Sequence, residues 1–390
     1  MTWLKRLGVL VLALIVVGAI GFFGFLADYV GNKSNNVIAH DPYPASDRAR
    51  ALHGTLFVGD WHADSLLWDR DLNTVGYGQV DFPRLRQGGV ALQVFTAVTK
   101  SPAGLNYEEN SAEAFDNITL LSFGQLRPIK TWTSLLARAE DQAMRLHAFR
   151  DADPSRIRII KSEADLDALI AARASDRDVI GALLGVEGGH PLEGKIENLA
   201  RLEEAGYRLI GLQHFFDNAL GGSLHGTSNA GLTAFGETVV DEVVRRGLIL
   251  DLAHSSQQVI IDVLARTDIP LVVSHTGLHS HCEVKRNIPD ALLKEIAARG
   301  GVIGMGYWAE VACGEITPEG IAKMIVAAVA AVGEDAVSLG SDYDGSVETA
   351  FDTSELPALT HALLEAGLSP AQIAKVMGEN MQRVIRARLN

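Results

Sequence analysis

The sequence predicts an α/β fold: a (β/α)8 barrel of the TIM type, preceded by an N-terminal transmembrane helix. Eight short apolar runs rich in Val, Ile and Leu alternate with stretches of helical periodicity, a pattern typical of strands buried on both faces. Residues able to bind a metal or move a proton follow most of these runs, and a barrel gathers such residues at the C-terminal edge of its strands. The runs are 56–60, 90–97, 179–186, 209–212, 248–252, 271–273, 302–306 and 337–340.

The composition is that of a globular protein with a large core. The chain has 390 residues, of which 47% are hydrophobic and 21% charged, and this balance argues against extensive disorder. Its net charge of -14 disfavours nucleic acid as a partner, because a polyanion would be repelled. The same charge is compatible with metal cations and zwitterionic small molecules.

The N-terminal segment has the length and polarity of a membrane anchor. Residues 7–27 form an uncharged apolar run, which as a helix covers roughly 30 Å, the thickness of one bilayer core. Lys5 and Arg6 precede it, so the N-terminus should stay cytoplasmic and the remainder be exported, periplasmic or extracellular. A cleaved signal peptide is the alternative, although the run is long and no A-x-A site closes it.

These features divide the chain into three parts. We expect residues 1–30 to be a transmembrane or signal-anchor segment, 31–50 a linker, and 51–390 the barrel domain. A long insertion follows the second strand, at about 100–178. Helical periodicity predicts helices at 112–121, 132–150, 193–205, 232–246, 257–265, 291–299, 318–331, 353–366 and 370–388.

Candidate metal ligands stand at the ends of several predicted strands. His62 and Asp64 are two residues apart after the first strand, so in an extended segment they face the same side. Glu187 ends the third strand before two glycines, where its two oxygens could bridge two ions. His254 and His275 end adjacent strands, and neutral imidazole is a common zinc ligand. Nitrogen and oxygen donors without a thiolate favour zinc, although manganese or cobalt fits the same set.

Further polar residues follow the remaining strands. Asp342 comes after the last strand, where an unshared carboxylate could take a proton from a metal-activated water and deliver it to a leaving amine. His214 follows the fourth strand and could donate a hydrogen bond to an oxyanion. Tyr307 follows the seventh strand and is a candidate substrate-binding residue. Asp344 is the rival of Asp342, but its place before Gly345 suits a turn cap.

Together these motifs resemble the membrane (renal-type) dipeptidases, peptidase family M19 of the amidohydrolase superfamily. The resemblance runs from about residue 55 to 385, and its pieces occur in the family order. They are His62-x-Asp64, Gly185-Val186-Glu187-Gly188-Gly189-His190, His214 with Asn218, Asp251-Leu252-Ala253-His254, Ser274-His275, Arg286-Asn287-x-Pro289-Asp290 and Gly340-x-Asp342-x-Asp344-Gly345.

The resemblance implies a zinc-dependent dipeptidase in which two metal ions activate a hydroxide. It places one zinc on His62 and Asp64 and the other on His254 and His275, with Glu187 bridging them. Three further roles are implied. Asp342 would be the catalytic proton shuttle, His214 would contact substrate and intermediate, and Arg286 would bind the substrate's carboxylate.

The resemblance also implies a homodimer and broad dipeptide tolerance, including D-residues at the C-terminal position. Cys282 and Cys313 follow neighbouring strands, so the spacing fits either a bridge or two unpaired thiols, and the resemblance favours the bridge. One departure is the N-terminal apolar segment, since the mammalian members carry a C-terminal lipid anchor.

Two alternative functions stay open at this point. A lactonase or phosphotriesterase-like barrel hydrolase would bridge its metals with a modified lysine after the fourth strand, where this chain has His214. A non-catalytic exported binding protein would keep the barrel and lose a ligand or the proton shuttle, whereas every candidate position is filled here.

Overall fold

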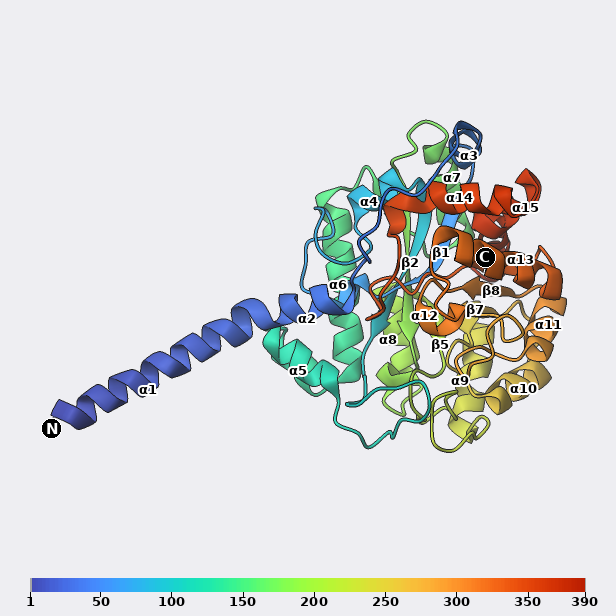
Figure 1. Cartoon of the computed structure of the whole chain (residues 1–390). Coiled ribbons are helices and arrows are strands. Elements are labelled where there is room, and N and C mark those ends of the chain that lie inside the picture. Colours follow the sequence, from blue (N-terminus) through green and yellow to red (C-terminus); the bar gives the residue numbers. More distant parts are fainter. Residues whose placement is uncertain (1, 390) are drawn as a thin grey trace.

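A computed structural model describes residues 2–389 and confirms the predicted barrel (Figure 1). Eight parallel strands pair in the order β1, β2, β4, β5, β6, β7, β8 and β9, and β9 pairs with β1 to close the ring. Each lies on a predicted apolar run, with bounds shifted by a few residues. The barrel strands are β1 (Val58–Ala63), β2 (Val90–Val98), β4 (Ile180–Glu187), β5 (Tyr207–Gly211), β6 (Ile249–Asp251), β7 (Val272–Thr276), β8 (Val302–Met305) and β9 (Val337–Leu339).

The insertion after β2 contains one strand and one helix that the sequence did not predict. The short strand β3 (Ile157–Ile159) pairs with the beginning of β4, before the residues of β4 that pair with β5. Helix α7 (Glu163–Arg173) follows, with Ser162 as its N-cap. β3 therefore extends the sheet outside the closed ring.

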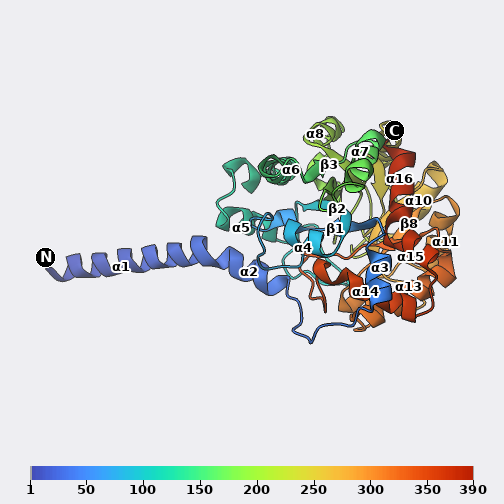
Figure 2. The same cartoon turned by 90° about the horizontal axis from the view of Figure 1, so that it is seen from above.

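The other helices cover the outside of the barrel, as Figures 1 and 2 show. Most agree with the predicted ranges, but α5 begins five residues later than expected, at Asn117, directly after its N-cap Asp116. They are α3 (Asp47–His53), α4 (Phe82–Gln87), α5 (Asn117–Gly124), α6 (Leu135–Ala152), α8 (Glu197–Ala205), α9 (Ala234–Arg245), α10 (Gln257–Arg266), α11 (Asp290–Ala298), α12 (Ala309–Ala312), α13 (Pro318–Val332), α14 (Leu356–Glu365), α15 (Pro370–Ala374) and α16 (Asn380–Arg388). Short 3₁₀ turns lie at Ser65–Leu67, Ile129–Trp132, His190–Leu192 and Thr353–Glu355, and a π-helical turn at Lys375–Glu379 joins α15 to α16.

Helix α16 closes the end of the barrel where the strands begin. Met381 and Val384 of this helix belong to one buried apolar cluster with Leu92 and Leu183 of the barrel strands. The amide of Asn380 donates a hydrogen bond to the carbonyl of Val337, the first residue of β9. The opposite end, where the strands terminate, is therefore the one left for polar side chains.

A single long helix forms the N-terminal segment and projects from the body (Figures 1 and 2). It consists of α1 (Thr2–Gly21), a π-helical turn (Phe22–Leu26) and α2 (Ala27–Ser34). Its stretch Lys5–Ser34 is long and apolar enough to cross a membrane, and its most apolar window is not buried in the protein. The sequence prediction of a helix of membrane-spanning character is thus confirmed.

The residues after this helix are ordered against the barrel. The buried Asn35 accepts a hydrogen bond from the backbone N–H of Ser346, and Val37 forms a parallel bridge with Thr349. The start of the segment expected to be a linker therefore packs on the loop that follows β9.

The two cysteines form a disulfide. The sulfurs of Cys282 and Cys313 are bonded, and their Cα atoms lie 5.6 Å apart. The bond ties the loop after β7 to the one after β8, as the family resemblance implied, and no free cysteine occurs among the described residues.

Candidate active site

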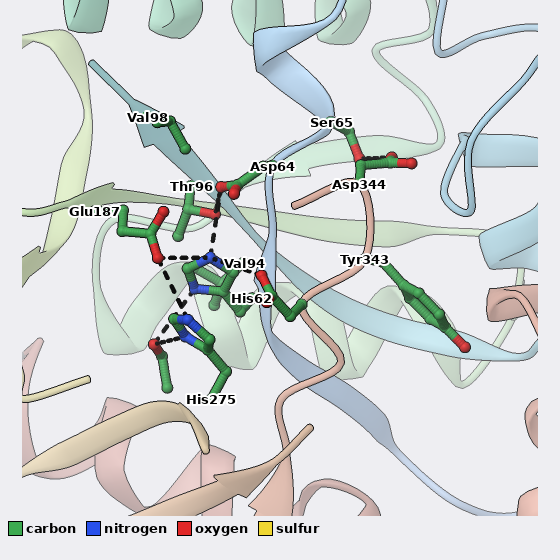
Figure 3. Close-up of polar contacts among 12 residues, drawn as sticks. His62, Asp64, Ser65, Val94, Thr96, Val98, Glu187, His275, Tyr343 and Asp344 are labelled. Atoms are coloured by element: carbon green, nitrogen blue, oxygen red, sulfur yellow. Dashed lines mark hydrogen bonds and ion pairs between the residues drawn. The ribbon is translucent and has the colours of Figure 1, made fainter. Parts of the chain in front are cut away.

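The predicted ligands meet at the C-terminal edge of the barrel because each stands at or just beyond a strand end. His62 lies near the end of β1, Glu187 ends β4, and His275 lies in β7. Asp64 follows β1 directly, and His254 comes three residues after β6. Figure 3 shows the side chains of His62, His275 and Glu187 pointing toward one another, with Asp64 beside them.

The Glu187 carboxylate is the centre of this cluster. Its Oε1 lies 3.4 Å from His62 Nε2, 3.0 Å from His254 Nε2 and 3.3 Å from His275 Nε2. Asp64 Oδ1 lies 3.5 Å from His62 Nε2. The nitrogens of His254 and His275 are 2.9 Å apart. All five side chains are at least 95% buried, so they share one enclosed site.

The two oxygens of Glu187 are not divided between the two expected ligand pairs. Oε1 faces all three imidazoles named above, whereas Oε2 lies 3.2 Å from Nε2 of His214. The structure thus brings the predicted ligands together around one carboxylate, and it adds His214 to the contacts of that carboxylate.

A shell of buried hydrogen bonds fixes the orientation of these ligands. Ser274 Oγ lies 2.8 Å from Nδ1 of His275 and 3.3 Å from Nδ1 of His62, so that Nε2 of each ring is turned toward Glu187. Thr96 on β2 donates a hydrogen bond to Asp64 Oδ1 at 2.5 Å (Figure 3). Partners of this kind set the tautomer and direction of metal ligands.

Two further buried carboxylates hold the backbone at the strand ends. Asp60 accepts hydrogen bonds from the backbone N–H groups of His62 and Ser341 at 2.9 and 3.2 Å. Asp251 accepts from the backbone N–H groups of Ala253 and Ser274 at 3.0 and 2.9 Å. Each carboxylate therefore joins two neighbouring strand ends that carry site residues.

The electrostatics of the site favour a bound cation. Burial lowers the pKa of His62, but Glu187 and Asp64 outweigh it and raise that pKa to about 10. Burial lowers the pKa of His254 and His275 well below its usual value, and it raises the pKa of Glu187, as does the nearby Asp64. Three imidazole nitrogens and two carboxylate groups thus lie close together with little solvent around them, and a cation bound among them would be stabilised by all five.

The donor set fits a metal. Its groups of potential ligands are His62 with Glu187 and His275, Glu187 with His214 and His254, and His62 with Asp64 and Asp342. Nitrogen and oxygen ligands of a tetrahedral zinc lie about 3.3 Å from one another, given bonds of roughly 2.0–2.1 Å. The contacts of Glu187 Oε1 have this spacing. In addition, Nε2 of His62 has no hydrogen-bond partner among the described residues, as expected of an atom that a metal would engage.

Asp342 and Asp344 have different environments. Asp342 Oδ1 lies 3.7 Å from His62 Nε2, and burial raises its pKa to about 7, with His62 lowering and Asp64 raising it. Asp344 is fully buried and accepts a hydrogen bond from Ser65 (Figure 3). It also accepts a hydrogen bond from the backbone N–H of Gln79 and forms an ion pair with Arg70. Asp344 thus holds the loop, and Asp342 faces the site.

Backbone conformation sets the direction of two of these side chains. His254 and Asp342 have φ of +63° and +62°, the left-handed region that non-glycine residues seldom adopt. Such residues cost of order 1–3 kcal/mol each and cluster at functional sites. The surrounding hydrogen bonds of the strand-end carboxylates offset that strain.

A cavity of about 360 Å³ opens above the cluster. Asp64, Glu187, His214, His254, Arg286 and Asp342 lie in its wall, together with apolar and aromatic side chains. Arg286 is 1% exposed, and its Nη2 donates to the carbonyl of His275 at 2.9 Å. Its Nε and Nη1 have no partner among the described residues, and its guanidinium lies 5.3 Å from the ring centre of Trp308.

His214 has an acceptor on each side of its ring. Nε2 faces Glu187 Oε2 at 3.2 Å and Nδ1 faces the carbonyl of Lys100 at 3.3 Å, so the neutral ring donates to only one of them. We assign the proton to Nε2, because the carboxylate is the stronger acceptor and the distance is shorter. Burial lowers the pKa of His214 to about 4, which keeps the ring neutral at neutral pH.

The structure does not bring Tyr307 into the cavity wall. Its ring is fully buried and packs on those of Tyr343 and Phe351, at centroid distances of 5.5 and 5.1 Å. The expected substrate contact of Tyr307 has no support in this placement.

Several cavity-lining residues were not found from the sequence. Some lie in loops without hydrophobic periodicity, and others lie on β2, on α5 and on the N-terminal helix. These residues are Val30, Ser34, Leu67, Trp68, Val98, Ser101, Leu105, Tyr107, Asn117, Ile118, Leu121, Phe215, Gly345 and Ser346. The aromatic residues among them were the only signal available, since Trp68, Tyr107 and Phe215 stand in otherwise polar or irregular stretches.

A buried imidazole and carboxylate cluster at the C-terminal end of a (β/α)8 barrel defines a barrel metallohydrolase. Comparison with known proteins narrows this class. The chain belongs to the membrane dipeptidase family, peptidase family M19, whose model matches residues 46–389. It is therefore a metallo-dipeptidase, an enzyme of the class that hydrolyses dipeptides with bound metal.

Individual relatives agree with this assignment. The chain is 30% identical to the dipeptidase aclJ of Aspergillus oryzae over 323 residues, which are 79% of this chain and 70% of that protein. It shares its fold with the probable dipeptidase PvdM of Pseudomonas aeruginosa (TM-score 0.72, 18% identity, 88% of this chain and 98% of that one). A metallopeptidase of Rhodobacter sphaeroides, solved with a phosphinate mimic of the dipeptide L-Ala-D-Ala, has the same fold (TM-score 0.68, 23% identity, 86% and 99% covered).

The role of Ser274 as an orienting group is testable by metal affinity. The variant Ser274→Ala removes the hydroxyl that faces Nδ1 of both His275 and His62, so we expect metal affinity to fall about 10–100-fold. The measurement is a competition titration against a metal chelator. Ser338→Ala is the matched control, since this serine of β9 is buried and its hydroxyl has no partner among the described residues. Equal affinities of both variants would remove Ser274 from this role.

Proposed function

We propose that this chain is a membrane-anchored, zinc-dependent dipeptidase that holds two metal ions per subunit. The observation that carries the proposal is the convergence of His62, Asp64, His254 and His275 on the carboxylate of Glu187. Membership of a metallo-dipeptidase family supports the reaction, and the enclosed nitrogen and oxygen donor set supports zinc.

In this proposal the five side chains act in two pairs around one shared ligand. His62 and Asp64 would hold one ion, His254 and His275 would hold the other, and Glu187 would contribute to both. The short distances within each pair, 3.5 Å between His62 Nε2 and Asp64 Oδ1 and 2.9 Å between the Nε2 atoms of His254 and His275, support this division. When bound, the metals supply Lewis-acid activation of the scissile carbonyl and of the attacking water.

Asp342 is assigned the proton transfer of the reaction, and His214 is assigned a hydrogen bond to the reacting carbonyl. The Asp342 carboxylate lies beside His62 and in the cavity wall, where it takes a proton from the attacking water and passes it to the leaving amine. His214 also lies in the cavity wall, and its Nε2–H would turn from Glu187 Oε2 to the carbonyl oxygen as negative charge develops there. Asp344 is engaged by Arg70 and Ser65 and is left out of the reaction.

Arg286 is assigned to the free carboxylate of the substrate. Its guanidinium is always charged, and two of its nitrogens are unpartnered in the cavity wall. A carboxylate accepts from such a fork in bidentate fashion. Binding the substrate's C-terminal carboxylate at Arg286 fixes the distance between that carboxylate and the metal-binding side chains. Only the peptide bond that precedes the C-terminal residue can then reach those side chains.

The substrate class follows from the cavity. A volume of about 360 Å³ lies at the small end of ligand pockets, which span roughly 300–1,000 Å³, and suits a dipeptide. The Rhodobacter sphaeroides relative holds a mimic of L-Ala-D-Ala, which supports tolerance of a D-residue at the C-terminal position here.

Location and assembly complete the proposal. The N-terminal helix anchors the chain with its first residues in the cytoplasm, and residues 51–390 form the exported catalytic domain after the 31–50 segment. The Cys282–Cys313 bond supports an oxidising compartment. The catalytic domain is further proposed to form a homodimer.

Metal removal tests the proposed mechanism directly. We expect the chelated protein to lose hydrolysis of a dipeptide panel and to regain it on addition of zinc, because the carbonyl and the water are then activated again. The measurement is release of free amino acids before and after zinc is restored. Hydrolysis that persists in demetallated protein would contradict a metal-dependent reaction, and recovery with manganese but not zinc would change the metal assignment.

Arg286 is tested with paired substrates. We expect Arg286→Ala to lower kcat/KM for free dipeptides by roughly 30- to 5,000-fold, because removing one partner of a buried, hydrogen-bonded charge pair costs about 2–5 kcal/mol. C-terminal dipeptide amides, which have no carboxylate to bind, should be hydrolysed at nearly unchanged rates. Arg286→Lys should recover part of the loss on free dipeptides.

The control is Arg245→Ala, which alters an exposed arginine of α9 paired with Glu242. It should leave both substrates unaffected. If Arg286→Ala loses activity equally on dipeptides and amides, Arg286 supports the fold around His275 and another group sets the substrate length.

A further inference from the structure

Exposed apolar side chains gather on one part of the catalytic body. Among residues 39–389, the large apolar side chains classed as exposed are Val75, Leu105, Phe115, Leu120, Leu126, Ile129, Met144 and Ile261. Five of these eight lie between Leu105 and Ile129, on α5 and the loops beside it. We define the α5 surface as Phe115, Leu120, Leu126 and Ile129, which are 55%, 53%, 66% and 75% exposed.

The N-terminal helix leaves the body at this surface. The rings of Phe22 and Phe23 lie 5.7 and 5.2 Å from that of Phe123 on α5, and Phe123 packs on Trp132 at 5.0 Å. Both views of the structure place α5 beside the root of the projecting helix (Figures 1 and 2). The aromatic group therefore connects the membrane-spanning candidate to the α5 surface.

The contact also sets the depth of the α5 surface. The apolar run ends at Ala27, about one helical turn of 5.4 Å beyond Phe22 and Phe23. In a helix that spans the bilayer, these two residues lie near the boundary between hydrocarbon and headgroups, where aromatic residues are enriched. Phe123 and Trp132 then lie at the same level.

Helix α5 is held firmly in this position. Asp116, its N-cap, accepts a hydrogen bond from Thr119 at 2.9 Å and from the buried Arg138 of α6 at 2.5 Å. Arg138 also donates to the carbonyls of Thr99 and Thr131, at 2.6 Å each. The apolar side chains of the α5 surface are thus presented on a braced element, and turning them inward would break this network.

We infer that the α5 surface lies in the interface of the lipid bilayer and is a second membrane contact of the catalytic domain. The inference rests on the proposed anchoring by the N-terminal helix. Burying exposed apolar side chains in lipid gains roughly 25 cal/mol per Å² removed from water, and the helix keeps the surface at the membrane at no further cost of association.

This contact places the substrate cavity next to the membrane. Ile118 and Leu121, on another face of α5, line the cavity, as do Val30 and Ser34 of α2. Helix α5 therefore borders both the cavity and the proposed membrane contact, and α2 continues directly from the apolar run. Substrates would therefore enter the cavity beside the bilayer surface.

The test uses the full chain reconstituted in lipid nanodiscs. Single cysteines are introduced by Leu126→Cys, Ile129→Cys and Ile261→Cys and labelled with an environment-sensitive fluorophore, since no described cysteine is free. Ile261 is the matched control, because it is 45% exposed on α10, far from α1 in both views. Dipeptide hydrolysis by each labelled variant shows that it is folded.

We expect blue-shifted emission at positions 126 and 129, quenched by nitroxide-bearing lipids, and neither effect at position 261. Emission at 126 and 129 that matches position 261 would overturn the inference. A blue shift without quenching by lipid would also overturn it, because the surface would then be covered by a second copy of the chain.

A label at Leu12→Cys separates this inference from the anchor itself. Quenching at position 12 without quenching at 126 and 129 would keep the anchor and reject the α5 surface. In another outcome the labels at 126 and 129 are quenched, and the label at 12 is either lost from the protein or not quenched. That outcome would keep the α5 surface as a membrane contact and reject the anchor.

Discussion

The burial of several carboxylates in one small space is the constraint on which the site depends. Asp64, Glu187 and Asp342 all lie within 3.7 Å of Nε2 of His62, and each is at least 92% buried. Carboxylates this close repel one another, and burial further raises the pKa of Glu187 and Asp342. Divalent cations bound by this cluster would relieve this repulsion more fully than protons.

The rest of the barrel end stabilises that arrangement. Asp60 and Asp251 each bind backbone N–H groups from two strand ends, and Ser274 faces the rings of two ligands. The strained backbone of His254 and Asp342 is tolerated within this network. A parallel barrel provides such a scaffold because all its strands end at the same rim, so that residues far apart in sequence meet there.

The sequence allowed the barrel to be predicted because its strands are continuous apolar runs and its helices are amphipathic. The ligand cluster was predictable for the same reason, since His62, Glu187 and His275 lie at strand ends. The three-residue strand β3 was missed because Arg158 interrupts a very short apolar stretch.

The conformations of the loops could not be predicted from these patterns of apolar residues. Tyr307 was expected at the substrate, but its ring turns toward Tyr343 and Phe351 because those aromatic side chains offer a packing partner away from the cavity. Conversely, Tyr107 of a loop and Val30 of α2 line the cavity. The pattern of apolar residues in the sequence does not show that the loop and the helix lie there. The docking of Asn35 against the loop after β9 likewise depends on tertiary contacts that polar linker composition does not reveal.

The number of metal ions bound per chain tests the central claim most directly. We predict that the protein, dialysed against buffered free zinc and analysed by elemental mass spectrometry, holds two ions per chain. Glu187→Gln, which keeps the shape of the shared ligand and removes its charge, should hold fewer than one. The control Glu193→Gln, a residue hydrogen-bonded to Ser134, should hold two. A single ion in the unaltered protein, or two ions retained in Glu187→Gln, would contradict the account.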